Sequence, residues 1–97
     1  MLANMYMKLE AARQMVWYSC RCADAGIFDA RLSSSSKAFA ADAGMEVCTD
    51  AVQVLGGYGY SREYPVEKRM RDAKIYQIFE GTNQIQRLVI ASDILHS

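Results

Sequence analysis

Two short segments of this 97-residue chain combine residue types that could do chemistry. The first places three glycines just beyond an apolar helix, in the run Gln53-Val54-Leu55-Gly56-Gly57-Tyr58-Gly59-Tyr60. Because glycine has no Cβ, this run can adopt positive φ, lets a ligand approach the main chain, and can gather amides into an anion-binding concavity. The second is the loop Phe79-Glu80-Gly81-Thr82, which leaves one carboxylate at the mouth of a helix. Together they suggest a phosphate-approach loop and a general base.

Each segment also has a purely structural interpretation. Taken alone, the glycine run is favoured by about three to one as a helix C-cap followed by a tight turn. Taken alone, Glu80 is better explained as a favourable negative charge at a helix N-terminus. The local patterns therefore do not decide between chemistry and structure.

The order and spacing of the surrounding residues do decide. From Gln53 to Asp72 the chain reads Q-x-x-G-G-x-G-Y-x-x-E-x-x-x-x-K-x-x-x-D, and from Glu80 it reads E-G-T-x-Q-I-Q-R. This long, ordered pattern resembles the C-terminal region of the acyl-CoA dehydrogenases. The likeness covers nearly the whole chain but only the latter part of the family's C-terminal helical bundle. We therefore expect residues 1–97 to form a single partial domain, a fragment of such a bundle.

The resemblance implies an FAD-dependent dehydrogenase that introduces an α,β double bond into a saturated acyl-CoA, of the medium- or short-chain type. Glu80 matches the catalytic base, and Gly81 gives its carboxylate room beside the acyl chain. The segment Gln53, Val54, Leu55, Gly56 and Gly57 matches residues that contact the FAD of a neighbouring subunit, which implies a homo-oligomer. Three further positions match residues that touch the flavin or its phosphates: Thr82, Asn83 and Gln84. Electrons would leave to an electron-transferring flavoprotein.

The expected mechanism places specific demands on the surroundings of the base. Abstracting a proton α to a thioester needs a base whose pKa is raised, and a dry cavity achieves this by disfavouring the carboxylate. Phe79, where relatives often have Tyr, and the run Ile75-Tyr76-Ile78 are expected to supply apolar surroundings. We expect the isolated chain to have little or no activity, because the family's other domains are missing. The alternatives are a non-catalytic helical oligomerisation fragment and an acyl-CoA oxidase-like relative.

The elements that must position these residues are predicted to be helices. Apolar residues recur at helical spacing from Leu2 to about Ala25, where Gly26 provides a stop. Ser33–Ser36 offer N-caps for a second helix that reaches about Leu55. Pro65 suits the first turn of a short third helix, and Thr82 can cap the last one. The predicted fold is an all-α, antiparallel bundle of four helices.

Composition excludes several other classes of function. Eleven Lys and Arg residues balance eleven Asp and Glu residues, which argues against a nucleic-acid or membrane-surface role. The longest uncharged stretches are too short to span a bilayer, and no signal peptide is visible. Three cysteines and one histidine in unsuitable positions favour no metal site. An odd cysteine count fits a reducing compartment, so we expect bacterial cytoplasm or, in a eukaryote, the mitochondrial matrix.

Overall fold

The computed structural model describes residues 1–96, and all the regular elements in that range are helical. The all-α prediction is confirmed. The elements are α1 (Leu2–Asp24), α2 (Ala30–Leu55), α3 (Gly57–Tyr60), α4 (Val66–Lys74), the 3₁₀ turn η1 (Ile75–Gln77) and α5 (Asn83–Leu95).

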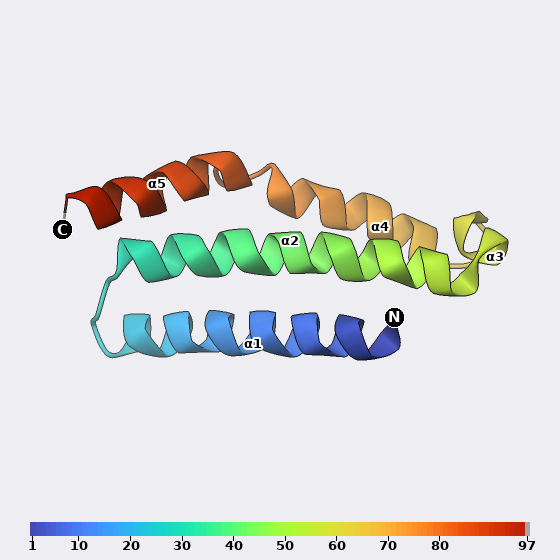
Figure 1. Ribbon diagram of the computed structural model, residues 1–97, viewed down its shortest axis with the longest axis horizontal. Coiled ribbons are helices and arrows are strands. Elements are labelled where there is room, and N and C mark those ends of the chain that lie inside the picture. The colour runs from blue at the N-terminus through green and yellow to red at the C-terminus, as the bar shows by residue number, and fades with distance from the viewer. Residues whose placement is uncertain (97) are drawn as a thin grey trace.

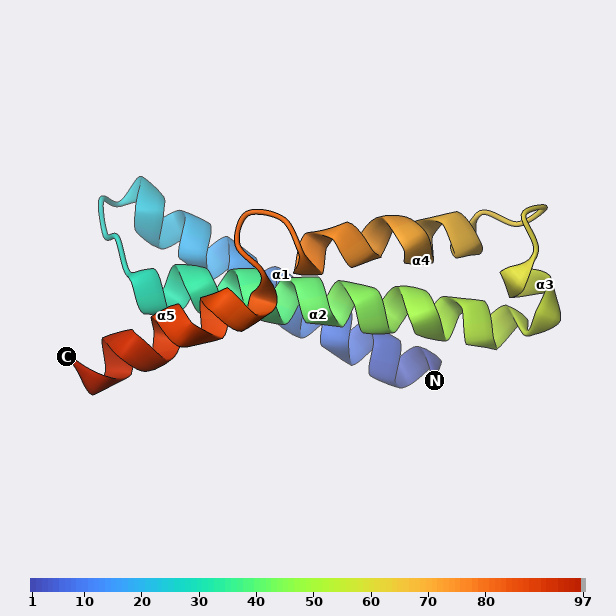
Figure 2. The ribbon, with the colours of Figure 1, turned by 90° about the horizontal axis from the view of Figure 1, so that it is seen from above.

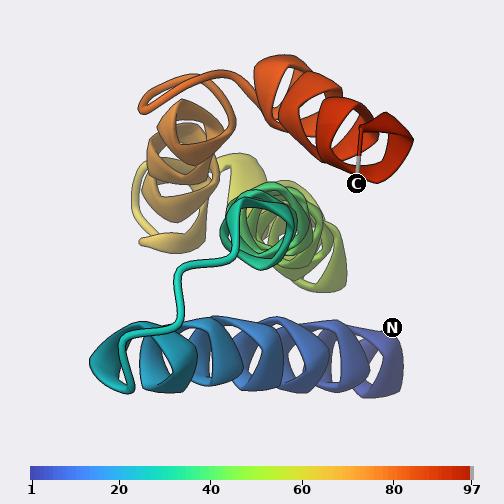
Figure 3. The ribbon, with the colours of Figure 1, turned by 90° about the vertical axis from the view of Figure 1, so that its left-hand side faces the viewer.

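Helix α2 is the central element of the molecule. Figure 1 shows α1 running antiparallel to α2 along one side, while α4 and α5 run antiparallel to it along the other. Seen from above and from the end, α1 crosses α2 obliquely, and α4 and α5 cover different parts of its upper surface (Figures 2 and 3). The short connections were expected to fold successive helices back on each other. Instead α5 runs in the same direction as α4, because the loop 78–82 joins the two helices without reversing the direction of the chain.

The helix ends show which local signals decided the boundaries. Gly26 has φ +81°, and the amides of Gly26 and Ile27 donate to the Ala23 and Cys22 carbonyls, so α1 ends in the predicted way as a Schellman motif. The prediction that Ser33–Ser36 cap the second helix is wrong. The cap is Asp29, whose carboxylate accepts a hydrogen bond from the Leu32 amide at 3.2 Å. An aspartate accepts this bond as well as serine does, and it lies one turn earlier.

The serines lie inside α2, where they help it to pack closely. Ser34 and Ser36 are buried, and the Ser36 hydroxyl donates to the Leu32 carbonyl at 2.9 Å. The same hydroxyl lies 3.3 Å from the Met15 carbonyl of α1. Satisfied in this way, a small polar side chain can be buried at little cost, which lets the two helices approach.

Small residues form the core. The buried apolar residues are all alanines, and no large side chain among the described residues is fully buried. The accessible surface is 6858 Å², against about 5,600 Å² for a typical monomer of this mass. The radius of gyration is 15.4 Å, against about 12.5 Å for a typical domain of this length. The bundle is therefore elongated, with large apolar side chains left on its outer faces. None of the helices described could cross a membrane.

Candidate active site

The loop that carries Glu80 is held in one conformation. Glu80 has φ +56°, the one positive value at a non-glycine residue in residues 1–96, and Gly81 follows at φ +82°. The Gln86 side chain donates to the Glu80 carbonyl at 3.0 Å, and the Lys37 ammonium donates to the Gly81 carbonyl at 2.9 Å. Thr82 then caps α5 as predicted, since its hydroxyl accepts a hydrogen bond from the Ile85 amide at 3.2 Å. The loop is therefore tied to both α2 and α5.

Glu80 lines a hollow of about 820 Å³ between α2 and the α4–η1 segment. Its floor on α2 consists of small residues, Ala40, Ala41 and Gly44. Tyr76 and Phe79 form part of the wall, with their rings edge to face at 5.0 Å. Of the apolar run expected around the base, Ile75 does not line this hollow and Ile78 lines a different one. The lining of the hollow is mostly apolar but includes three charged residues besides Glu80, namely Lys37, Arg69 and Asp72. Glu80 is also exposed, so removing water from its carboxylate requires cover from outside these residues.

The predicted flavin-contacting residues after Glu80 face a second hollow. This hollow has a volume of about 500 Å³ and lies on the other side of the loop 78–82. It is lined by Thr82, Asn83 and Gln84 together with charged residues of three helices: Asp42, Lys74 and Arg87. Gln84 is exposed and available for a ligand. Asn83 is only 3% exposed, and its side chain is committed to bonds within the chain.

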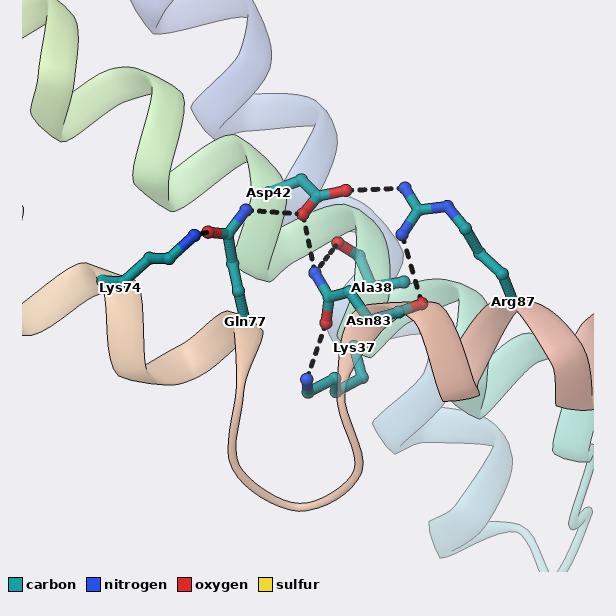
Figure 4. Close-up of polar contacts among 7 residues, drawn as sticks. All are labelled: Lys37, Ala38, Asp42, Lys74, Gln77, Asn83 and Arg87. Atoms are coloured by element: carbon teal, nitrogen blue, oxygen red, sulfur yellow. Dashed lines mark hydrogen bonds and ion pairs between the residues drawn. The ribbon is translucent and has the colours of Figure 1, made fainter.

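Figure 4 shows the polar network that contains Asn83. Asp42 of α2 is its hub: one carboxylate oxygen accepts from Gln77 at 2.8 Å and from Asn83 at 2.6 Å, and the other accepts from Arg87 at 2.6 Å. Burial alone would raise the pKa of Asp42, but the hydrogen bonds from Arg87, Gln77 and Asn83 outweigh it and hold that pKa below its usual value. Asp42 is therefore ionised at neutral pH.

Sequence reasoning missed Lys37 and Asp42. Their partners lie 35 to 46 residues away along the chain, in segments that no local spacing rule connects with the middle of α2. The one usable signal in the sequence was that both are charged residues within an alanine-rich helix. The structure shows that most neighbouring positions on this helix are buried or half-buried.

The glycine segment lies elsewhere, at the C-terminal end of α2. Lys37 marks the place of the Glu80 loop on α2, and the helical rise puts Gly56 about 28 Å further along. Only Gly56 has positive φ, at +63°, whereas Gly57 and Gly59 were expected to be free to adopt it and instead belong to α3. A Cβ on Gly59 would lie 2.5 Å from the Val52 carbonyl oxygen, so this glycine serves the packing of α3 on α2.

Gly56 and Gly57 present a different environment. No atom lies within 4 Å of a Cβ built on either of them, so their backbone is open to a ligand. Gln53, Val54 and Leu55 are also exposed, one turn before this open backbone. These features fit the predicted approach of a cofactor to the segment.

Comparison with known proteins identifies the family. Residues 1–95 match the model of the acyl-CoA dehydrogenase C-terminal domain. The chain belongs to the acyl-CoA dehydrogenase family. It is 53% identical over 94 residues to the cyclohexane-1-carbonyl-CoA dehydrogenase of Geobacter metallireducens, covering 97% of this chain and 25% of that protein. The chain thus spans about a quarter of the length of the curated relatives that it matches.

Several solved structures share this arrangement of helices. The butyryl-CoA dehydrogenase of Megasphaera elsdenii matches with a TM-score of 0.94 and 47% identity, over 97% of this chain and 24% of that one. The FAD complex of PigA matches with a TM-score of 0.90 and 27% identity, over 95% and 24%. The acyl-CoA dehydrogenase family depends on FAD, and these relatives carry the same bundle as part of a longer chain.

Proposed function

We propose that this chain supplies the catalytic base of an acyl-CoA dehydrogenase. The observation that carries the proposal is the placement of Glu80. It has positive φ in a loop that Gln86 bonds at the Glu80 carbonyl and Lys37 at the Gly81 carbonyl, and it borders a mostly apolar hollow of about 820 Å³. Positive φ at a non-glycine residue is uncommon, and strain of this kind is concentrated at functional sites. The hollow provides a surface for an acyl chain beside the carboxylate.

In the proposed reaction the Glu80 carboxylate takes the α proton of a saturated acyl-CoA. The backbone amide of Glu80 donates a hydrogen bond to the thioester oxygen and stabilises the charge that develops there. FAD, when bound, accepts the hydride from the β carbon. Gly81 leaves the acyl chain space beside the base, and Thr82 keeps the start of α5 in place. Electrons then pass to an electron-transferring flavoprotein, as the family resemblance implies.

The separation of the two predicted cofactor regions supports a homo-oligomer. The Gln53–Gly57 segment lies about 28 Å along α2 from the Glu80 loop. The open backbone of Gly56 and Gly57 therefore suits the FAD of a neighbouring subunit, while Thr82 and Gln84 lie beside the base of their own chain. We assign Asn83 a structural role, because its side chain is buried and both of its N–H donors and its oxygen are bonded within the chain.

The chain by itself is proposed to be catalytically incomplete. It is one partial domain, it corresponds to about a quarter of its relatives, and the Glu80 side chain is exposed. The alternative of a non-catalytic association module is supported by the large apolar side chains on the outer faces of the bundle. The two proposals differ in one respect, since only the first requires the Glu80 carboxylate.

The test is an anaerobic reduction assay on two forms of the protein. The chain is first mixed alone with FAD and butyryl-CoA, and we expect no bleaching of the flavin spectrum. It is then fused in place of the matching quarter of M. elsdenii butyryl-CoA dehydrogenase, and we expect butyryl-CoA to bleach the bound flavin. In the fusion, Glu80→Gln should retain FAD and slow bleaching by about 10²-fold or more. Bleaching by the Glu80→Gln fusion at the unmodified rate would refute the base assignment.

A further inference from the structure

We propose that Asp42 and Lys37 are positioning residues for Glu80, in that they fix the loop that presents the base to substrate. The inference rests on the proposed function and adds to it two residues of α2 that do not themselves touch the reacting atoms. Its basis is the polar network of Figure 4, which connects α2 to both ends of the loop 78–82.

Asp42 joins the chain before the loop to the chain after it. Gln77, the last residue of η1, donates to Asp42 Oδ1 at 2.8 Å. Asn83, the first residue of α5, donates to the same oxygen at 2.6 Å. Two segments separated by the loop thus meet on one carboxylate oxygen, which fixes the distance that the loop must span. Arg87 occupies Oδ2 at 2.6 Å and also donates to the Asn83 carbonyl at 3.2 Å.

Lys37 acts on the loop itself. Its ammonium donates to the Asn83 side-chain oxygen at 2.6 Å and to the Gly81 carbonyl at 2.9 Å. The second bond holds the peptide that follows Gly81 from the side of α2, while Gln86 holds the Glu80 carbonyl, in the peptide before it, from α5 at 3.0 Å. Glu80 and Gly81 are the two positive-φ residues of this loop, and the carbonyls of both are therefore fixed by side chains.

Asn83 couples the two positioning residues. It is 3% exposed, and its amide donates to the Ala38 carbonyl at 3.1 Å and to Asp42, while its oxygen accepts from Lys37. A buried amide with every polar atom satisfied has one orientation, so a shift of Asp42 or Lys37 must move the start of α5 and the loop with it. A strained base persists only when its surroundings over-determine it, and this network provides those constraints.

The chain offers a matched control for the contribution of general helix pairing. Arg31 and Asp93 also connect α2 to α5, at 2.7 Å between Arg31 Nε and Asp93 Oδ2, but they lie far from the loop. Asp93→Asn and Asp42→Asn each remove one carboxylate that bridges the same two helices. Asp42→Asn leaves a single oxygen for the three donors of Gln77, Asn83 and Arg87, so its amide group must face at least one donor that it cannot satisfy.

The experiment uses the butyryl-CoA dehydrogenase fusion and measures kcat, KM for butyryl-CoA and FAD content. Asp42→Asn should lower kcat by about tenfold to a hundredfold, the scale of loss for a misplaced catalytic group, with KM and FAD content within about twofold. Asp93→Asn should leave all three values within about twofold of the unmodified fusion. The same Asp42→Asn change is then made in the Glu80→Gln fusion. There it should cause no further loss, because Asp42 acts through the Glu80 carboxylate.

A kcat for Asp42→Asn within twofold of the unmodified fusion would overturn the inference. So would an Asp42→Asn change that lowers kcat by the same factor in the Glu80→Gln fusion as in the unmodified fusion. If Asp42→Asn does not yield a folded flavoprotein, Lys37→Met decides the question. It releases the Gly81 carbonyl and the Asn83 side-chain oxygen but removes none of the groups that donate to Asp42. Lys37→Met should lower kcat selectively and Lys37→Arg should restore most of it, whereas no kcat loss in Lys37→Met overturns the inference. A Glu80→Gln fusion as fast as the unmodified one refutes the proposed function itself, so the two failures are distinguishable.

Discussion

At the scale of single residues, Glu80 has a backbone conformation that costs free energy. A left-handed backbone brings the Cβ of an L-residue too close to the following carbonyl oxygen, at a cost of about 1–2 kcal/mol. Gly81, immediately next in the chain, adopts a similar φ without that cost. The chain therefore has a carboxylate at a position where glycine would cost less conformational free energy. Such a loss of stability is expected where a residue is selected for function.

This conformational cost predicts that Glu80→Gly stabilises the chain. Removing the Cβ relieves about 1–2 kcal/mol of strain, and the added freedom of glycine in the unfolded chain returns about 0.5–1 kcal/mol of it. We expect a net gain of up to about 1 kcal/mol, or a few degrees in Tm by circular dichroism. Glu80→Gln is the control, since it retains the Cβ and should leave Tm nearly unchanged. A lower Tm for Glu80→Gly would show that Glu80 contributes contacts that outweigh its strain.

The residues of the candidate site differ in how far the sequence could predict them. Glu80 and Thr82 stand in a dense local motif, so their roles could be proposed, and the cap at Thr82 is confirmed. Asp42 and Lys37 act through partners in α5, η1 and the loop, and such pairings depend on how α4 and α5 lie along α2. Asn83 lies within the motif, so a contact with the flavin was predicted for it, and that contact stays a prediction. The motif could not show that its side chain turns into the bundle, where it is 3% exposed.

At the scale of elements, the sequence predicted helices better than their connections. Helical periodicity and Gly26 located α1 almost residue for residue. The start of α2 was misplaced because four consecutive serines resemble caps, while a single Asp29 further upstream performs that role. Helix α3 was missed altogether, because a glycine-rich run predicts an open turn. Its formation depends on the contact of Gly59 with the backbone of α2, which no local pattern reveals.

Gly57 and Gly59, two of the glycines after α2, are therefore expected to respond differently to alanine. Gly59→Ala should destabilise the chain by about 1–3 kcal/mol, because its Cβ would lie 2.5 Å from the Val52 carbonyl oxygen. Gly57→Ala is the matched control, because a Cβ at Gly57 would meet no neighbouring atom within 4 Å and its φ is not positive. Its free energy of unfolding, measured by urea denaturation, should change by less than about 0.5 kcal/mol. Equal stability losses for the two variants would contradict the division of roles between packing and ligand approach. In the fusion, Gly57→Ala should instead weaken FAD retention.

At the scale of the whole molecule, the chain has a larger accessible surface than a typical monomer of its mass, and much of it comes from large apolar side chains. The helices meet through alanine and serine, so their backbones come close, but the side chains that could stabilise a bundle most point outward. Large exposed residues occur on every helix of ten or more residues: Trp17 is 52% exposed on α1, Phe39 41% on α2 and Leu88 65% on α5. Exposed large apolar side chains on all three long helices favour the interpretation that part of this surface is covered by another protein surface.

This apolar surface predicts self-association of the chain. At the concentrations of a sedimentation experiment we expect a mass above the 10.9 kDa of one chain, which falls towards that value on dilution by about a hundredfold. Leu88→Glu should weaken the assembly, because it places a charge on an apolar face of α5. Gln84→Glu adds the same charge one turn earlier on the same helix, at an exposed polar residue, and should leave the assembly unchanged. A mass of 10.9 kDa at every concentration would show that the chain stays monomeric with the outer faces of α1, α2 and α5 in water. The exposed apolar surface would then no longer support a homo-oligomer.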